Sequence, residues 1–115
     1  MVIGRPYIPE RGEIVWLDFD PQAGHEQAGR RPALVLSPRE YNSRAGLAIV
    51  CPITSQVKGY KLEASLPQGL PVQGVVLSDH IKSMDWRVRR AELICRAPRA
   101  VLLAVIGRVT SLLRE

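Results

Sequence analysis

Short runs of β-branched and aromatic residues, separated by Pro- and Gly-containing turns, dominate the chain up to residue 97. Residues 13–19 form the first run, and apolar runs at 33–37 and 47–54 predict two further strands. A short helical turn is expected near 40–43. Four more short strands are predicted over 61–66, 75–78, 81–86 and 91–95. The pattern therefore predicts about seven strands in a small, curled, mainly antiparallel barrel.

The spacing of hydrophobic residues changes after Pro98, and proline is favoured at the first residue of a helix. Apolar residues then recur at helical spacing to residue 113. One stripe consists of Val101, Val105, Val109 and Leu112, with Leu102, Ile106 and Leu113 beside it. So wide an apolar face needs more cover than one sheet edge supplies, so a partner subunit is expected.

Length and composition limit the domain organisation and the class of protein. The chain has 115 residues, of which 46% are hydrophobic and 23% charged. This composition excludes a disordered chain and predicts a single domain over residues 1–115. The longest apolar run, residues 100–106, is too short to span a membrane, and no signal-peptide pattern precedes the first strand. A cytoplasmic protein is expected.

The cysteines and histidines show no metal-ligand spacing. Cys51 and Cys95 lie in separate apolar runs, which favours buried reduced thiols, and His25 and His80 are far apart. No metal site and no cofactor are predicted.

The positive charge is unevenly distributed. The chain carries 16 Lys and Arg against 11 Asp and Glu, giving +5. Residues 1–81 contain eight basic and eight acidic residues, so the excess lies after Ile81, where Arg87, Arg89 and Arg90 are close together. Two interpretations follow: a binding face for phosphates or an acidic partner, or a solvated basic surface.

A long polar loop between the first two predicted strands carries the candidate chemistry. Residues 24–32 include His25, Glu26, Arg30 and Arg31, and such a loop in a small domain is often functional. Thr54 leaves its strand into another polar loop, which contains Gln56 and Lys58. Together these groups suit metal-free cleavage of RNA, whose 2′-hydroxyl is its own nucleophile. Alternatively, Arg31 pairs with Glu26 and holds the loop.

Four segments then resemble the MazF/PemK family of toxin endoribonucleases over nearly the full length. The segments are PERGEIVWLDFDP (9–21), GHEQAGRRPALVLSP (24–38), CPITSQ (51–56) with KGY (58–60), and DHIKSMDWR (79–87). The combination of an EQAGxRPxxVxS run with a strand ending in PxTxQ is specific to this family.

The resemblance implies an SH3-like barrel, shared with gyrase-poisoning toxins, that works as a homodimer. It implies metal-independent cleavage of single-stranded RNA at a short sequence, leaving a 2′,3′-cyclic phosphate and a 5′-hydroxyl. Arg31 stands at the family's catalytic arginine, which stabilises the phosphorane and donates a proton, and Thr54 at its catalytic threonine. Glu26 is the third catalytic candidate, as base or as a group that orients Arg31. A cognate antitoxin with an acidic, disordered segment is expected to compete with RNA.

Several residues are candidates for RNA binding. Phe19 either stacks on a base or belongs to the core, and His25 is an alternative general base or simply exposed. Trp86 is expected as a barrel or interface residue rather than a base platform. His80 stands where relatives often have glutamine, beside Asp79, in a loop that reads bases in this family. The RNA-binding candidates are Phe19, His25, Arg30, Gln56, Lys58, Asp79, His80, Lys82 and Arg87.

Two other functions fit the same barrel. One is a non-enzymatic inhibitor of DNA gyrase, and the other is a passive RNA-binding barrel without catalysis.

Overall fold

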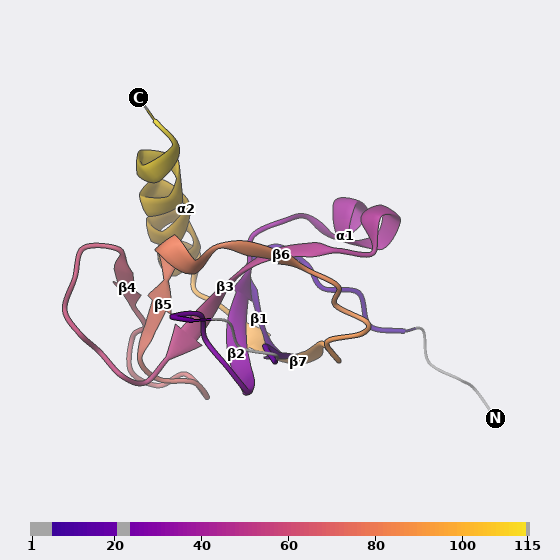
Figure 1. The fold of residues 1–115 in the computed structure, drawn as a ribbon, viewed down its shortest axis with the longest axis horizontal. Coiled ribbons are helices and arrows are strands. Elements are labelled where there is room, and N and C mark those ends of the chain that lie inside the picture. Colours follow the sequence, from indigo (N-terminus) through magenta and orange to yellow (C-terminus); the bar gives the residue numbers. More distant parts are fainter. Residues whose placement is uncertain (1–5, 21–23, 115) are drawn as a thin grey trace.

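The computed structural model describes residues 6–20 and 24–114 and contains one sheet with a C-terminal helix (Figure 1). The strands are β1 (Glu13–Asp18), β2 (Arg30–Val35), β3 (Ala48–Thr54), β4 (Glu63–Ser65), β5 (Val75–Leu77), β6 (Lys82–Met84) and β7 (Glu92–Arg96). The helices are α1 (Arg39–Ala45), the 3-10 turn η1 (Ser78–His80) and α2 (Arg99–Leu113). The prediction of about seven strands and a C-terminal helix is confirmed.

β3 is the central strand of the sheet. The strand order is β4-β5-β3-β2-β1-β7, with β6 paired to β3 outside this path, and every pairing is antiparallel. β3 pairs with β6 through its first residues and with β5 through its last two. The end of β3 at Thr54 therefore lies beside β5, which leads directly into η1.

Both faces of β3 are buried, which explains why its sequence is almost continuously apolar. One cluster contains Ile14, Leu34, Cys51 and Ile53 and packs against α2. The second contains Val15, Leu17, Phe19, Val50 and Trp86 on the other side. Cys51 is a free, fully buried thiol, and burial raises its pKa to about 12. Cys95 is also free but only half-buried.

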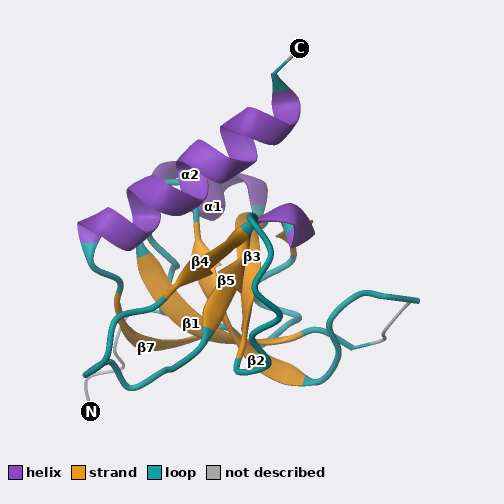
Figure 2. Ribbon diagram, turned by 90° about the vertical axis from the view of Figure 1, so that its left-hand side faces the viewer, coloured by secondary structure: helices purple, strands orange, loops and turns teal. Residues whose placement is uncertain are grey.

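α2 covers one side of the sheet with part of its apolar surface. Val101, Val105 and Val109 are buried there, as the stripe predicted. The C-terminal turns extend beyond the strands (Figure 2), and Leu112 and Leu113 are 48% and 80% exposed. Leu112, the last residue of the predicted stripe, is thus left without cover by this chain's sheet, as expected of an apolar face too wide for one sheet edge. No helix among residues 6–20 and 24–114 combines the length and hydropathy of a membrane-spanning segment.

Two predicted boundaries differ from the structure. β2 begins at Arg30, whereas the loop was expected to continue to Pro32. The hairpin stays paired that far because Asp18 pairs with Arg30, and because the Phe19 N–H donates to Gly29 O at 2.8 Å. β6 ends at Met84 rather than at Trp86. Trp86 turns into the second cluster instead, where its indole N–H donates to Asn42 O at 2.9 Å.

Candidate functional site

Two adjoining cavities lie where the β1–β2 loop, the end of β3 and η1 meet. The first cavity has a volume of about 310 Å³ and the second about 150 Å³. They share three lining residues, His25, Gln27 and His80, so they adjoin one another, and the two together are called the groove. The first cavity also contains Phe19, Glu26, Pro52, Asp79 and Lys82. The second also contains Thr54, Gln56, Lys58, Tyr60 and Glu63.

The β1–β2 loop is held by hydrogen bonds at its return to β2. The Asp20 carboxylate accepts from the Gly29 N–H at 2.9 Å, and Arg31 Nε donates to Ala28 O at 2.6 Å. This bond fixes the Arg31 guanidinium at Nε. Among the described residues, its terminal nitrogens have no hydrogen-bond or ion-pair partner, so they remain available to an anion.

The β2–β3 register relates Arg31 to Thr54. It pairs Ala33 with Pro52 and Leu34 with Cys51. The register ends at Ala33 and Pro52; continued by two residues along both strands, it would align Arg31 with Thr54. Because side chains alternate along a strand, both residues share the face that carries Pro52, a residue of the first cavity. Thr54 lines the second cavity, whereas Arg31 lies beside the groove and is not one of its lining residues.

The Thr54 hydroxyl is held at the end of β3. The residue is 6% exposed, and its Oγ1 accepts from the Gln56 N–H at 3.1 Å. Gly74 crosses directly beside it: a Cβ at this position would lie 2.0 Å from Thr54 O, and its φ of +114° also requires glycine. The backbone of residue 74 therefore supports the position of Thr54.

Glu26 pairs with a lysine rather than with the expected arginine. Its Oε2 lies 3.6 Å from Lys82 Nζ, across the first cavity. The alternative in which Arg31 pairs with Glu26 is wrong, because Arg31 is bonded to Ala28 O instead. Lys82 and Glu26 are separated by 56 sequence positions, which is why sequence reasoning missed this pair.

Tyr60 links the loop after β3 to η1. Its hydroxyl donates to Asp79 Oδ1 at 3.1 Å. Partial burial, this hydrogen bond and the negative charges of Asp79 and Glu63 raise the pKa of Tyr60 to about 12. Tyr60, Gln27 and Glu63 line the groove without having been predicted as site residues, although Gln27 and Tyr60 lie in the EQAG and KGY motifs.

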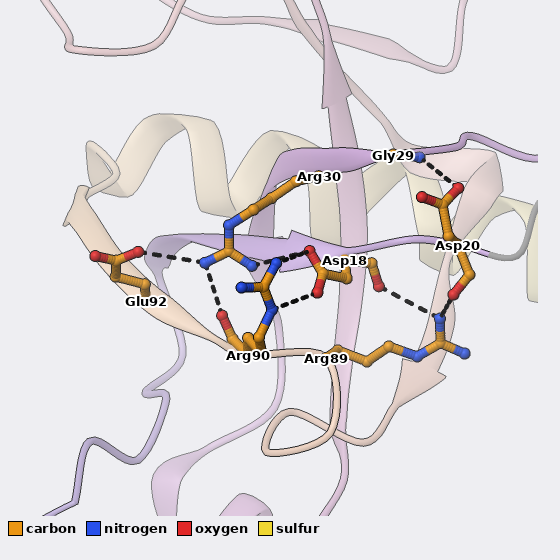
Figure 3. Close-up of polar contacts among 7 residues, drawn as sticks. All are labelled: Asp18, Asp20, Gly29, Arg30, Arg89, Arg90 and Glu92. Atoms are coloured by element: carbon orange, nitrogen blue, oxygen red, sulfur yellow. Dashed lines mark hydrogen bonds and ion pairs between the residues drawn. The ribbon is translucent and has the colours of Figure 1, made fainter.

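Arg30 does not join the groove. It lies on the opposite face of β2 from Arg31, where it contacts Asp18 Oδ1 at 3.1 Å and Glu92 Oε1 at 3.2 Å (Figure 3). Arg90 also binds Asp18, with Nε 2.7 Å from Oδ2. Hydrogen bonds from Arg90 and Arg30 lower the pKa of Asp18. Arg30 thus links β1, β2 and β7 outside the groove, and its proposed contact with RNA stays a prediction.

The basic segment after β6 is largely exposed, but two of its arginines contact the β1–β2 hairpin. Arg89 donates to the backbone carbonyls of Asp18 and Asp20, as Figure 3 shows. Arg87 is exposed and its guanidinium lies 5.1 Å from the centre of the Trp86 ring, away from both cavities. Arg89 and Arg90 therefore contact the β1–β2 hairpin, while the Arg87 side chain and the 69% exposed Arg90 side chain remain at the surface.

Phe19 belongs to the core. Its side chain is 2% exposed within the second cluster, although it also lines the first cavity. The core alternative therefore describes it better than base stacking. Within residues 6–20 and 24–114, no three His, Cys, Asp or Glu side chains are grouped so that they could hold a metal ion.

The chain is a small curled sheet with a C-terminal helix and an open groove of mixed charge. These features define a class of compact β domain whose groove suits an extended, flexible ligand. The model of the family described as "PemK-like, MazF-like toxin of type II toxin-antitoxin system" matches residues 10–113. The chain belongs to this family.

Individual relatives support this family assignment. The chain is 49% identical over 85 residues to the endoribonuclease toxin MazF of Escherichia coli K12, covering 74% of this chain and 76% of that protein. The crystal structure of MazF from Deinococcus radiodurans matches with a TM-score of 0.92 and 58% identity, covering 94% and 98% of the two chains. A MazE–MazF structure from the same organism matches with a TM-score of 0.86 and 58% identity over 94% and 97%. These comparisons identify an endoribonuclease toxin and do not support the gyrase inhibitor.

Proposed function

We propose that this toxin cleaves single-stranded RNA at a short recognition sequence, without a metal ion, in the groove between the β1–β2 loop and η1. The observation that supports this most strongly is the β2–β3 register, which ends at the pair Ala33 and Pro52 and, continued by two residues, brings Arg31 and Thr54 to one face of the two strands. A guanidinium and a hydroxyl on one face suit the two charged oxygens of a phosphorane.

The chemistry requires three events. A base removes the proton from the 2′-hydroxyl, the 2′-oxygen attacks phosphorus, and the bond from phosphorus to the 5′-oxygen breaks. Arg31 stabilises the phosphorane and protonates the leaving oxygen, while Thr54 hydrogen-bonds the scissile phosphate. The products are a 2′,3′-cyclic phosphate and a 5′-hydroxyl.

Glu26 and His25 are the two candidate bases, and both side chains line the first cavity. The variants Glu26→Gln and His25→Asn separate them, because only loss of the base removes the acidic limb of the pH–rate profile. Gln56, Lys58, Asp79, His80 and Lys82 line the same groove and are proposed RNA contacts.

Cleavage of a long, unstructured RNA in EDTA tests the proposal. Mapping of the new ends is expected to show a recurring short sequence with cyclic-phosphate termini. Arg31→Ala and Thr54→Ala are each expected to lower the rate by about 10²-fold or more. Intact RNA after incubation with folded wild-type protein would contradict the proposal and would favour a passive RNA-binding barrel.

The partners follow from the relatives and from the exposed surface. MazE accompanies MazF in the matched Deinococcus structure. We propose that an acidic, disordered antitoxin segment binds this chain in the cytoplasm and competes with RNA. The exposed Leu103, Leu112 and Leu113 also support a homodimer. Sedimentation measures the dimer, and unchanged RNA cleavage at saturating antitoxin would contradict competition.

A further inference from the structure

Glu63 is a buried carboxylate at the start of β4 whose partners are two backbone amides. Its side chain is 8% exposed. Oε1 accepts from the Gly59 N–H at 2.7 Å, and Oε2 accepts from the Lys58 N–H at 3.0 Å. Burying a carboxyl group is costly unless its oxygens are hydrogen-bonded, so these two bonds offset its burial and hold the loop.

The same residue closes the loop a second time through its own backbone. The Glu63 N–H donates to Tyr60 O at 3.1 Å. Residues 58–63 are thereby held at three points: two amides by the carboxylate and one carbonyl by the Glu63 amide. This short segment follows Thr54 and Gln56 and carries Lys58 and Tyr60 into the second cavity.

The remaining anchor of this loop lies on the other side of the groove. Tyr60 donates to Asp79 in η1, and Glu63 pairs with Leu77 in β5, the residue before η1. Lys58 itself is exposed, and no ion pair fixes its ammonium among the described residues. The orientation of Lys58 toward the groove therefore depends on its backbone, and its backbone depends on Glu63.

We propose that Glu63 is a positioning residue for RNA binding: through the Lys58 and Gly59 amides, its carboxylate fixes the loop that presents Lys58 beside Thr54. The proposal rests on the proposed function of the groove. In this role Glu63 acts through Lys58, so its removal is expected to weaken binding much more than the chemical step.

Glu63→Gln provides the first test, because glutamine keeps one acceptor oxygen and places an NH₂ group against an amide N–H. We expect the KM for the RNA to rise about tenfold, with kcat changed less than about twofold. Amide hydrogen exchange at residues 58 and 59 is expected to accelerate, while exchange at Val105 stays unchanged. Glu40→Gln, on the exposed surface of α1, is the matched control and should leave all values unchanged.

A double-mutant cycle distinguishes positioning from a general loss of stability. In a Lys58→Ala background, Glu63→Gln is expected to add no further rise in KM, because the side chain it positions is gone. Glu63→Asp keeps both oxygens and the charge and is expected to restore part of the affinity. Additive effects in the double variant, or a wild-type KM in Glu63→Gln, would overturn the proposal.

The outcome is separable from the proposed function itself. Binding of a non-cleavable RNA, with a 2′-deoxynucleotide at the mapped cleavage position, reports on Lys58 independently of catalysis. Wild-type protein that does not cleave RNA overturns the proposed function. Wild-type cleavage, with Glu63→Gln binding the non-cleavable RNA as tightly as wild type, overturns only the role of Glu63.

Discussion

Lys82 and Glu26 form an ion pair across the first cavity, with 3.6 Å between Nζ and Oε2. One residue lies in the β1–β2 loop and the other in β6, so the pair joins two walls of the groove. Both side chains are partly exposed, at 34% and 52%, so the pair contributes at most about 1 kcal/mol to stability. Because the pair is weak, the Lys82 ammonium can exchange the Glu26 carboxylate for an RNA phosphate.

Lys82→Ala is expected to weaken RNA binding while leaving the unfolding temperature nearly unchanged. Loss of one phosphate contact should reduce the slope of log K against log salt by about 0.7. Binding of a non-cleavable RNA at several salt concentrations measures this slope. Arg44→Ala, which removes another exposed ion pair on α1, is the control, and an equal slope in the two variants would contradict the prediction.

Gly74→Ala is expected to destabilise the protein and to reduce cleavage together. The new Cβ would lie 2.0 Å from Thr54 O, and the φ of +114° disfavours any side chain. A loss of about 2 kcal/mol or more in the free energy of unfolding is expected. Denaturant unfolding and the cleavage rate provide the two measurements.

Gly107 provides the matched glycine control. It lies within α2, and a Cβ there would meet no atom within 4 Å. Gly107→Ala is expected to stabilise the protein by about 0.5–1 kcal/mol, because alanine has the higher helix propensity. If both alanine variants behaved alike, the close approach of Gly74 to Thr54 would not be the cause.

Asp18→Asn is expected to change how stability depends on pH. In the folded protein, hydrogen bonds from Arg90 and Arg30 lower the pKa of Asp18 below its unfolded value. This contribution is present above the unfolded pKa and is lost as the pH falls through the folded pKa. The stability difference between wild type and Asp18→Asn should therefore be largest near neutral pH and shrink below about pH 4.

Urea unfolding of both proteins between pH 3 and pH 7 measures this difference. Glu40→Gln is again the control, since the Glu40 carboxylate pairs with Arg44 on an exposed helix. A constant difference between wild type and Asp18→Asn across this range would show that the arginines do not act through the Asp18 charge.

Val105→Ala is expected to lower the free energy of unfolding by about 2–3 kcal/mol, because Val105 on α2 is fully buried against the sheet. Leu113→Ala removes a larger side chain that is 80% exposed and should change the stability of the monomer by less than about 0.5 kcal/mol. Denaturant unfolding at low protein concentration measures both. Equal losses in the two variants would contradict the packing of α2.

Local patterns were sufficient for most of the fold. The apolar run at 47–54 predicted β3, and the change of period after Pro98 predicted α2. The boundary of β2 could not be found this way, since polar Arg30 and Arg31 and the following proline all favour a loop. Only pairing with β1, which is a tertiary effect, extends the strand to Arg30.

Only part of the groove could be predicted from the sequence, because tertiary contacts set the rest. The loop residues His25 and Glu26 and the strand end at Thr54 do meet η1. The partners of the charged groups were not predictable, because Arg90 reaches Asp18 across 72 positions and Lys82 reaches Glu26 across 56. Sequence reasoning also treated Arg87, Arg89 and Arg90 as one surface, whereas two of them bind the hairpin.

Arg30 and Arg31 are neighbours in the sequence but lie on opposite faces of β2. The residue type at position 30 should depend on Asp18 and Glu92, whose carboxylates Arg30 contacts. The residue type at position 31 should depend on the proposed cleavage chemistry at the groove. A comparison of many homologues should therefore show Arg30 covarying with Asp18 and Glu92, while the proposed catalytic Arg31 stays constant, so that the hairpin's framework can change without its chemistry.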